Sequence, residues 1–286
     1  MAVYKRSYKG YTGVLTPPSS RFLILARYGY ARLMHSKFVV IFLAVCMFYP
    51  LACLTYIYAA HNPAFLARLS IPGGRLPPVD GRFFYLYCNV QGALAYLLTA
   101  FISPALITSD LANGALPLYF CRPFSRREYV GAKLTLLLGL LSIFTWIPGL
   151  LLFAIESNLS GWVWMQTHFW IATGIFVGLV IWIVTVALLG LALSAWVKWK
   201  LAAGALVLGV FFAGAGFGAA INEVMRTNTG TVIDLTQVIH TIWSDLLRYD
   251  AGIDMPVTTA WIALGTICVI CILLLARRVR AFEVVK

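Results

Sequence analysis

The sequence is poor in charge, and poorest in acidic residues. Only 11% of its 286 residues are Asp, Glu, Lys or Arg, whereas a soluble globular domain has about 25%. Asp and Glu number 10 against 22 Lys and Arg. Hydrophobic residues make up 61%, and the mean hydropathy is +0.87. This composition excludes an ordinary soluble domain and predicts an all-α integral membrane protein.

The sequence also lacks the groups that would let it supply its own energy. It contains no GxxxxGK[ST] phosphate loop, which a nucleotide-hydrolysing subunit requires. The apolar runs carry almost no charge away from their ends, whereas ion-coupled carriers use ionisable residues inside the membrane. We therefore predict no catalytic residue in this chain and no enzymatic activity.

Histidine and cysteine do not form a metal-binding or redox pattern. The four histidines lie at the ends of apolar runs or in loops, so paired haem ligands within spans are not expected. Five of the six cysteines lie in apolar runs, where Cys acts as a small hydrophobic residue. Cys268 and Cys271 stand on one helix without a second pair. We predict no metal site and no cofactor bound to this chain.

Residues 1–36 form a basic leader. The first long apolar run begins only at Phe38, so we expect no cleavable signal peptide. Residues 21–36 predict an amphipathic helix lying in the membrane interface; the alternative is a lead-in turn to the first span. The apolar face of this helix comprises Phe22, Leu25, Ala26, Gly29, Tyr30 and Leu33.

Six apolar runs follow, each near or above the ~20 residues that a membrane span needs. We expect one transmembrane domain over 1–286, with a six-span bundle at 37–276 and a tail at 277–286. The spans are predicted at 37–60, 83–109, 128–156, 168–197, 201–221 and 256–276.

The distribution of Lys and Arg predicts the orientation, since cytoplasmic loops are enriched in both. With the N-terminus in the cytoplasm, 17 of the 22 Lys and Arg lie inside and 5 outside. The net charge is then +14 inside and −2 outside. The total of +12 is therefore a topology signal and not a sign of nucleic-acid binding. We expect a multi-pass protein of the cell (inner) membrane with both termini in the cytoplasm.

Two outer loops have distinct patterns. Residues 157–167 predict a short loop in which Trp162 and Trp164 anchor the interface. Residues 232–249 predict an amphipathic external helix over the outer end of the bundle. That helix could act as a gate or as a passive cap.

A stripe of small residues lies in the fifth run. Gly214 and Gly218 form a GxxxG pattern, and Gly209 and Ala213 extend it. Such stripes let two helix backbones approach closely. We expect a tight helix contact here, either within the subunit or across a dimer.

The segment at 103–133 is the longest patterned stretch that cannot lie wholly in a membrane. We expect Asp110 to begin a short amphipathic helix, which Arg122-Pro123 would end. Ser125 and Glu128 form an S-x-x-E capping box that opens the third span. The alternative is a plain interfacial turn carrying positive-inside arginines.

This segment resembles the corresponding region of ABC-2-type permeases, the membrane subunits of a large class of ABC exporters. The chain departs from the common pattern in carrying Asp at 110, Leu at 111 and Ala at 115. The resemblance extends to the six-span layout, the N-terminal helix and the basic tail. The matching residues are Asp110, Gly114, Leu116, Leu118, Arg122, Pro123, Phe124, Ser125, Arg126, Arg127, Glu128 and Lys133.

The resemblance implies a coupling helix at about 110–118 that docks on a separate nucleotide-binding ATPase subunit. ATP and Mg would bind in that partner, and a second permease copy, identical or related, would complete the transporter. The helix would carry motion to the first, second and fifth spans. Arg122, Arg126 and Arg127 would contact acidic groups of the ATPase or lipid phosphates. The implied contact set also contains Asp110, Leu111, Gly114, Leu116, Leu118, Pro123, Ser125 and Glu128.

Two other functions would fit parts of this pattern. One is a structural anchor subunit of a larger complex, without a transport path. The other is an ion-coupled carrier, which the missing intramembrane charges disfavour. The sequence does not identify a cargo.

Overall fold

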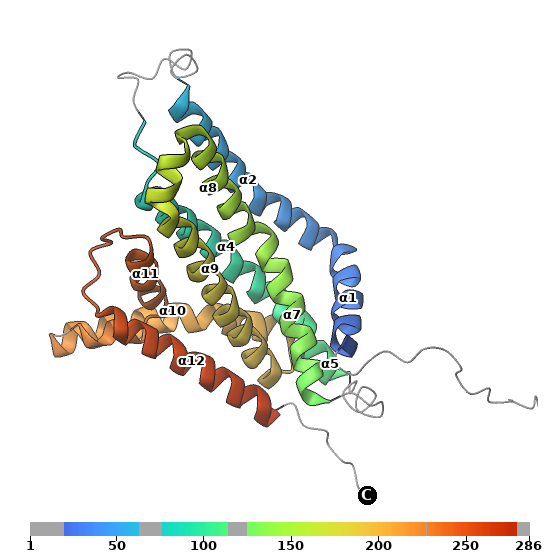
Figure 1. The fold of residues 1–286 in the computed structure, drawn as a ribbon. Coiled ribbons are helices and arrows are strands. Elements are labelled where there is room, and N and C mark those ends of the chain that lie inside the picture. Colours follow the sequence, from blue (N-terminus) through green and yellow to red (C-terminus); the bar gives the residue numbers. More distant parts are fainter. Residues whose placement is uncertain (1–19, 63–75, 114–124, 227, 279–286) are drawn as a thin grey trace, which may run out of the picture.

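The fold is a bundle of long helices (Figure 1). The computed structural model describes residues 20–62, 76–113, 125–226 and 228–278, and these contain no β-strand. The elements are α1 (Arg21–Met34), α2 (Lys37–His61), α4 (Gly81–Leu106), α5 (Thr108–Ala112), α7 (Arg126–Phe144), α8 (Trp146–Ser160), α9 (Trp162–Trp196), α10 (Lys200–Met225), η2 (Thr229–Val232), α11 (Leu235–Leu246) and α12 (Val257–Arg278).

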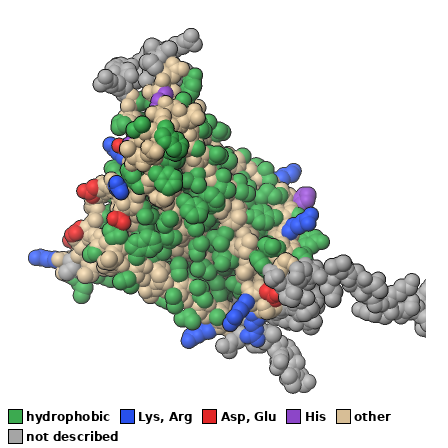
Figure 2. Space-filling model, in the orientation of Figure 1, with side chains coloured by type: hydrophobic (Ala, Val, Ile, Leu, Met, Phe, Trp, Pro, Cys, Tyr) green, Lys and Arg blue, Asp and Glu red, His purple; other side chains and the backbone are tan. Residues whose placement is uncertain are grey.

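Within the described residues, six helical stretches are long and apolar enough to cross a membrane, in agreement with the six predicted spans. The second combines α4 with most of α5, and the third combines α7 with α8. Large apolar side chains on α2, α10 and α12 are exposed, including Phe48, Phe212 and Ile262. Figure 2 shows hydrophobic side chains filling the middle of the visible face and charged ones toward its edges. This surface matches a protein whose solvent is lipid.

The charged residues divide between the two ends of the bundle. We call the end that holds α1, α5, the start of α7 and the turn at 197–199 the basic end. The opposite end, which holds α11 and the end of α8, we call the acidic end. The described residues with charged side chains at the basic end are Arg27, Arg32, Lys37, Asp110, Arg126, Arg127, Glu128, Lys133, Lys198, Lys200, Arg277 and Arg278; those at the acidic end are Asp80, Arg82, Glu156, Glu223, Arg226, Asp234, Asp245, Arg248, Asp250 and Asp254.

The helix α9 is the centre of the bundle. It packs against α4, α7, α8, α10, α11 and α12, and it runs between them in Figure 1. Its glycines allow close approach: a Cβ at Gly190 would meet Thr99 and Ser103 of α4 at 2.7–3.0 Å. Core side chains such as Ile175, Leu179 and Val186 are fully buried. A helix that is buried on most sides is apolar nearly all round, which explains why the part of α9 from Ile171 to Trp196 is almost wholly hydrophobic.

Aromatic side chains join neighbouring helices through hydrogen bonds. The indole N–H of Trp182 donates to the carbonyl of Gly92 at 2.9 Å. The hydroxyl of Tyr96 donates to the carbonyl of Val207 at 2.7 Å. Both side chains are buried, and each bond pairs a polar tip that would be costly to leave unpaired in an apolar interior.

The third span is broken in the middle. Thr145 departs from helical geometry, with φ −97° and ψ −95°, and separates α7 from α8. Pro148 follows within the first turn of α8, where its missing N–H is tolerated. The buried hydroxyl of Tyr87 donates to the carbonyl of Thr145 at 2.7 Å. The predicted span at 128–156 is present as the stretch Arg126–Ser160, and the break within it at Thr145 was not predicted.

The connection between α8 and α9 is shorter than predicted. The loop expected at 157–167 reduces to Gly161, whose φ of +92° suits glycine. Trp162 and Trp164 therefore belong to the first turn of α9. The polar residues that suggested a loop continue the two helices instead. A tight turn at 197–199 joins the next two helices, because α9 ends at Trp196 and α10 begins at Lys200.

The predicted N-terminal helix is present as α1, and its apolar face packs against α7. Ala26 is buried, and the side chain of Leu136 occupies the space that a Cβ at Gly29 would fill. The hydroxyl of Tyr30 likewise occupies the space that a Cβ at Gly139 would fill. One face of α1 therefore packs on protein, while Leu23, Ile24 and Tyr28 remain exposed on the other.

The predicted external helix is present as α11, and its apolar face packs on α9, α12, α10 and α4. Trp243 lies at the centre of this contact and is 1% exposed. Its indole N–H donates to the carbonyl of Gly178 at 3.1 Å, and its ring meets Trp182 edge to face. Asp234 caps the helix by accepting from the N–H of Thr236 at 2.9 Å. Trp243, the largest side chain of α11, therefore anchors this helix in the end of the bundle.

We predict that acid weakens the attachment of α11 through His240. This ring stacks on Trp243 and meets Tyr85 edge to face, and its burial lowers its pKa, against a smaller raising effect of Asp234. Neutral His240 is therefore favoured when folded, so its contribution to stability is present above its ordinary pKa of 6.5 and is lost as the pH falls below it. Thermal unfolding in detergent, scanned from pH 8 to pH 5, measures this effect.

The variant His240→Gln should unfold with a weaker pH dependence than the parent chain. His35→Gln, at an exposed position at the end of α1, is the matched control and should keep the parental slope. Equal slopes for the parent and His240→Gln would contradict the assignment.

Candidate functional site

The candidate site lies at the basic end, in the segment at 103–133. The described part of that segment consists of 103–113 and 125–133. Gly114, Leu116, Leu118, Arg122 and Pro123 lie outside the described residues. The described parts that connect this segment to the bundle are α5 and the start of α7, and we call these two parts the roots of the segment.

Asp110 is the centre of a partly buried polar cluster. Its Oδ2 accepts from the hydroxyl of Tyr129 at 2.8 Å and pairs with Nζ of Lys133 at 2.8 Å. The ammonium of Lys133 also lies 5.4 Å from the centre of the Tyr129 ring. The two charged side chains are only 14% and 11% exposed. The pair therefore holds α5 against α7 at a largely buried position.

Asp110 does not play the capping role expected from the sequence. The helix α5 begins at Thr108, two residues earlier, and has no side-chain cap. It follows α4 after a single turn residue, Ile107, so Asp110 lies inside a helix that continues the second span. Its carboxylate is available to Lys133 because it need not satisfy backbone N–H groups.

A second hydrogen bond fixes α5 to α9. The hydroxyl of Thr108 is buried and donates to the carbonyl of Ser194, near the end of α9, at 2.8 Å. The helix also packs against α4 and α10. The root of the segment is thus attached to the second, third, fourth and fifth spans.

The other root is the predicted capping box, which is confirmed. Ser125 Oγ accepts from the N–H of Glu128 at 3.2 Å, and the Glu128 carboxylate accepts from the N–H of Ser125 at 2.5 Å. This reciprocal pair starts α7 and leaves Arg126 and Arg127 exposed. Two adjacent guanidinium groups at a fixed helix start can bind carboxylate or phosphate groups.

Sequence reasoning missed the partners of Asp110. Tyr129 and Lys133 are spaced i, i+4, so they share one face of α7. An acidic residue that precedes such a Tyr/Lys pair by a short stretch of sequence is a usable signal for a contact among the three side chains. Thr108 gave no signal, because its partner is a backbone carbonyl 86 residues away.

The glycine stripe of α10 packs within the subunit in part. A Cβ at Gly218 would lie 2.7 Å from the carbonyl oxygen of Gly230, and one at Gly214 would lie 2.9 Å from that of Ile233. The backbone around η2 therefore packs directly on α10, because these two glycines have no side chain. Gly209 faces open space and Ala213 is exposed. The predicted four-residue face is thus divided between an internal contact and an uncovered surface.

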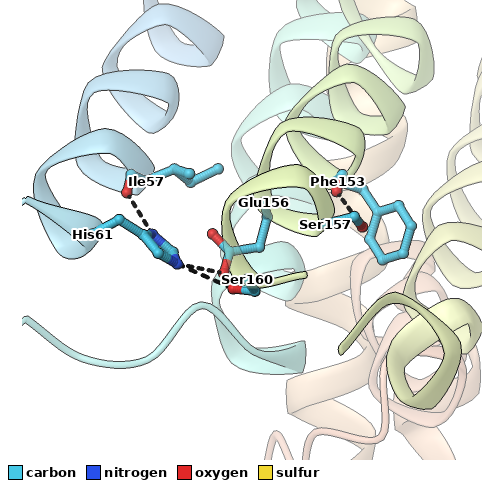
Figure 3. A network of polar contacts seen from close by, with 6 residues as sticks. All are labelled: Ile57, His61, Phe153, Glu156, Ser157 and Ser160. Carbon is cyan, nitrogen blue, oxygen red and sulfur yellow. Dashed lines mark hydrogen bonds and ion pairs between the residues drawn. The ribbon is translucent and has the colours of Figure 1, made fainter. Parts of the chain in front are cut away.

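A second polar network lies at the acidic end and was not predicted (Figure 3). Glu156 is 3% exposed and accepts from the hydroxyl of Ser160 at 2.7 Å. His61 Nε2 lies 3.0 Å from that hydroxyl and 3.5 Å from Glu156 Oε1. His61 Nδ1 donates to the carbonyl of Ile57 at 3.1 Å, since a carbonyl only accepts. The network ties the end of α2 to the end of α8.

One oxygen of this buried carboxylate has no hydrogen-bond partner among the described residues. Glu156 Oε2 is buried without a hydrogen bond. Glu156 lies near the end of the third span, as the sequence places it, but the burial of its side chain was not predicted. Among the described residues, no group of three His, Cys, Asp or Glu side chains is arranged to hold a metal ion.

No protein-family model matches this sequence, and the search of curated proteins finds no match. The geometry and the sequence therefore carry the functional inference.

We predict that Lys133→Met destabilises the chain by about 2 kcal/mol, because it leaves the buried Asp110 carboxylate without its counter-charge. The double variant Asp110→Asn/Lys133→Met should regain much of this loss. Tyr129→Phe, which removes one hydrogen bond, should cost about 1 kcal/mol. Thermal unfolding in detergent compares the variants. A double variant as unstable as the sum of its single changes would contradict a coupled pair.

At the acidic end we predict that His61→Ala is more harmful than Glu156→Gln. The first change leaves a buried carboxylate with Ser160 alone, whereas the second removes a charge that has one unpaired oxygen. Their coupling in a double-mutant cycle should be on the order of 1 kcal/mol, since His61 is partly exposed.

Ser157→Ala is the matched control for this cycle. It removes a buried hydrogen bond to the carbonyl of Phe153 on the same helix and should not couple to His61→Ala. Coupling of equal size in the control would show that the effect comes from α8 as a whole.

Proposed function

We propose that this chain is the membrane-spanning permease subunit of an ATP-driven ABC exporter. A separate nucleotide-binding subunit would bind ATP and Mg and dock at the basic end, and a second copy or a related chain would complete the membrane part. The observation that carries the proposal is the partly buried Asp110–Lys133 pair, which fixes α5 to α7 at the root of the segment that resembles a coupling helix.

The way in which this root is attached supports transmission of force. A partner that moves a loop transmits motion only if the loop ends are rigidly fixed to the spans. Here Thr108 binds the end of α9 and Asp110 binds α7, while α5 also contacts α4 and α10. The proposed path therefore runs into the second, third, fourth and fifth spans. The exposed Arg126 and Arg127 stand beside it as a cationic contact for the ATPase.

The need for a partner follows from the sequence. A chain without a phosphate loop and with few charges inside its spans has no recognised means of coupling energy to transport by itself. Under this proposal the basic end faces the cytoplasm of the cell (inner) membrane, in agreement with the positive-inside rule.

The test begins with the chain purified from its native membrane. The expected partner carries a phosphate-loop motif, and the complex hydrolyses ATP and accumulates cargo inside inverted vesicles. A redox or synthase partner would overturn the proposal in favour of a structural anchor. Uptake driven by a proton gradient without ATP would indicate an ion-coupled carrier.

We predict that the charge reversal Arg126→Glu/Arg127→Glu weakens ATPase recovery and lowers ATP-dependent transport about tenfold or more, because like charges then face an acidic partner. Arg27→Glu/Lys198→Glu is the matched control, since it reverses two exposed charges at the same end outside the segment. Unchanged coupling in the Arg126/Arg127 variant, or an equal loss in the control, would contradict the role assigned to these arginines.

A further inference from the structure

A cavity with a basic lining opens at the basic end, between α1, α2, α4, α5, α7 and the start of α10. Its volume is about 380 Å³. Its walls are apolar where Val39, Phe101 and Leu136 line them, and polar where charged groups converge. The elements that form this end gather beside one another in Figure 1.

The charges in this cavity are unbalanced. Arg32, Lys133 and Lys200 line it together with one carboxylate, Asp110. Lys133 is already paired with Asp110. Arg32 and Lys200 are exposed, and no carboxylate of the described residues pairs with either. The cavity therefore presents two uncompensated cations to an entering group.

A second cavity continues from the first and is almost wholly apolar. It has a volume of about 340 Å³ and lies between α4 and the first turns of α10. The two cavities share Phe101, Ala105 and Lys200. Pro104 and Leu208 line the second cavity away from the charges. A basic chamber followed by an apolar groove has the polarity of an amphiphile with an anionic head.

We propose that these connected cavities bind an anionic phospholipid from the leaflet at the basic end. Its phosphate lies between Arg32 and Lys200, and one acyl chain follows the groove along Leu201 and Leu208. Basic pockets between membrane helices are suited to anionic head groups. Phe101, which is 52% exposed and lines both cavities, marks the boundary between head and chain.

Charge complementarity favours a lipid over a second copy of this chain in the groove. A second copy would bring further Lys200 charge to a mouth that already carries excess positive charge. A phosphate group neutralises that excess. The proposal concerns lipid binding to this chain alone and does not depend on the exporter function.

The test uses the full chain, purified and stripped of lipid in detergent, with native mass spectrometry of bound molecules. The probes are dioleoyl phosphatidylglycerol, dioleoyl phosphatidylcholine and glycerol 3-phosphate. Two cations at a membrane surface favour an anionic over a neutral lipid by about 30-fold. Arg32→Gln/Lys200→Gln should remove this preference. Arg27→Gln/Lys198→Gln, which loses the same charge outside both cavities, should keep it.

A third variant separates the lipid from free phosphate. Ala205→Trp places a large side chain at an exposed position lining the apolar groove. It should weaken phosphatidylglycerol binding at least tenfold without changing the response to glycerol 3-phosphate. It also carries the test if the double variant does not fold, as judged by circular dichroism.

Three results would overturn the proposal. The first is equal binding of the anionic and neutral lipids. The second is glycerol 3-phosphate bound as tightly as phosphatidylglycerol, which would make phosphate the ligand. The third is a dimer, visible in the same spectra, that excludes lipid and is abolished by Ala205→Trp, which would assign the groove to a second copy.

Discussion

The bundle depends on one constraint: a polar group among apolar helices must find its partner inside the protein. Tyr87, Tyr96, Trp182 and Trp243 each donate to a backbone carbonyl of another element. These bonds join α4 to the α7–α8 break, to α10 and to α9, and they join α11 to α9. Because apolar side chains distinguish poorly between neighbours and lipid, such bonds specify which helices pair and at what height. They give the bundle a register that hydrophobic packing alone would not provide.

The sequence predicts the six spans well, because hydropathy records the lipid environment directly. It also predicts α1 and α11 through their helical periodicity, and the start of α7 through the capping box at Ser125 and Glu128. It fails at Thr145 and Gly161, where single residues decide whether a helix breaks or turns. Those outcomes depend on contacts such as the bond from Tyr87, which lies 58 residues from its acceptor.

The candidate site shows the same division. The charged residues of the segment are visible in the sequence, but their pairing is not. A helix cap was the natural prediction for Asp110, because acids are common at helix starts. The fold instead places it opposite Lys133, where the loss of water strengthens their attraction. Local sequence rules predict the most frequent role of a residue type. For Asp110, a tertiary ion pair with Lys133 replaces that role.

The length of α9 has a consequence for the position of the protein in its membrane. With 35 residues it is about 52 Å long at the usual rise of 1.5 Å per residue. The hydrocarbon core is only about 30 Å thick, and even a tilt of about 40° leaves a reach near 40 Å. If the basic end is level with the lipid head groups, the other end of α9 extends beyond the hydrocarbon. The adjoining end of α8 then places Glu156, with His61 of α2 beside it, in the hydrated layer, where a buried carboxylate costs far less than it would among lipid tails.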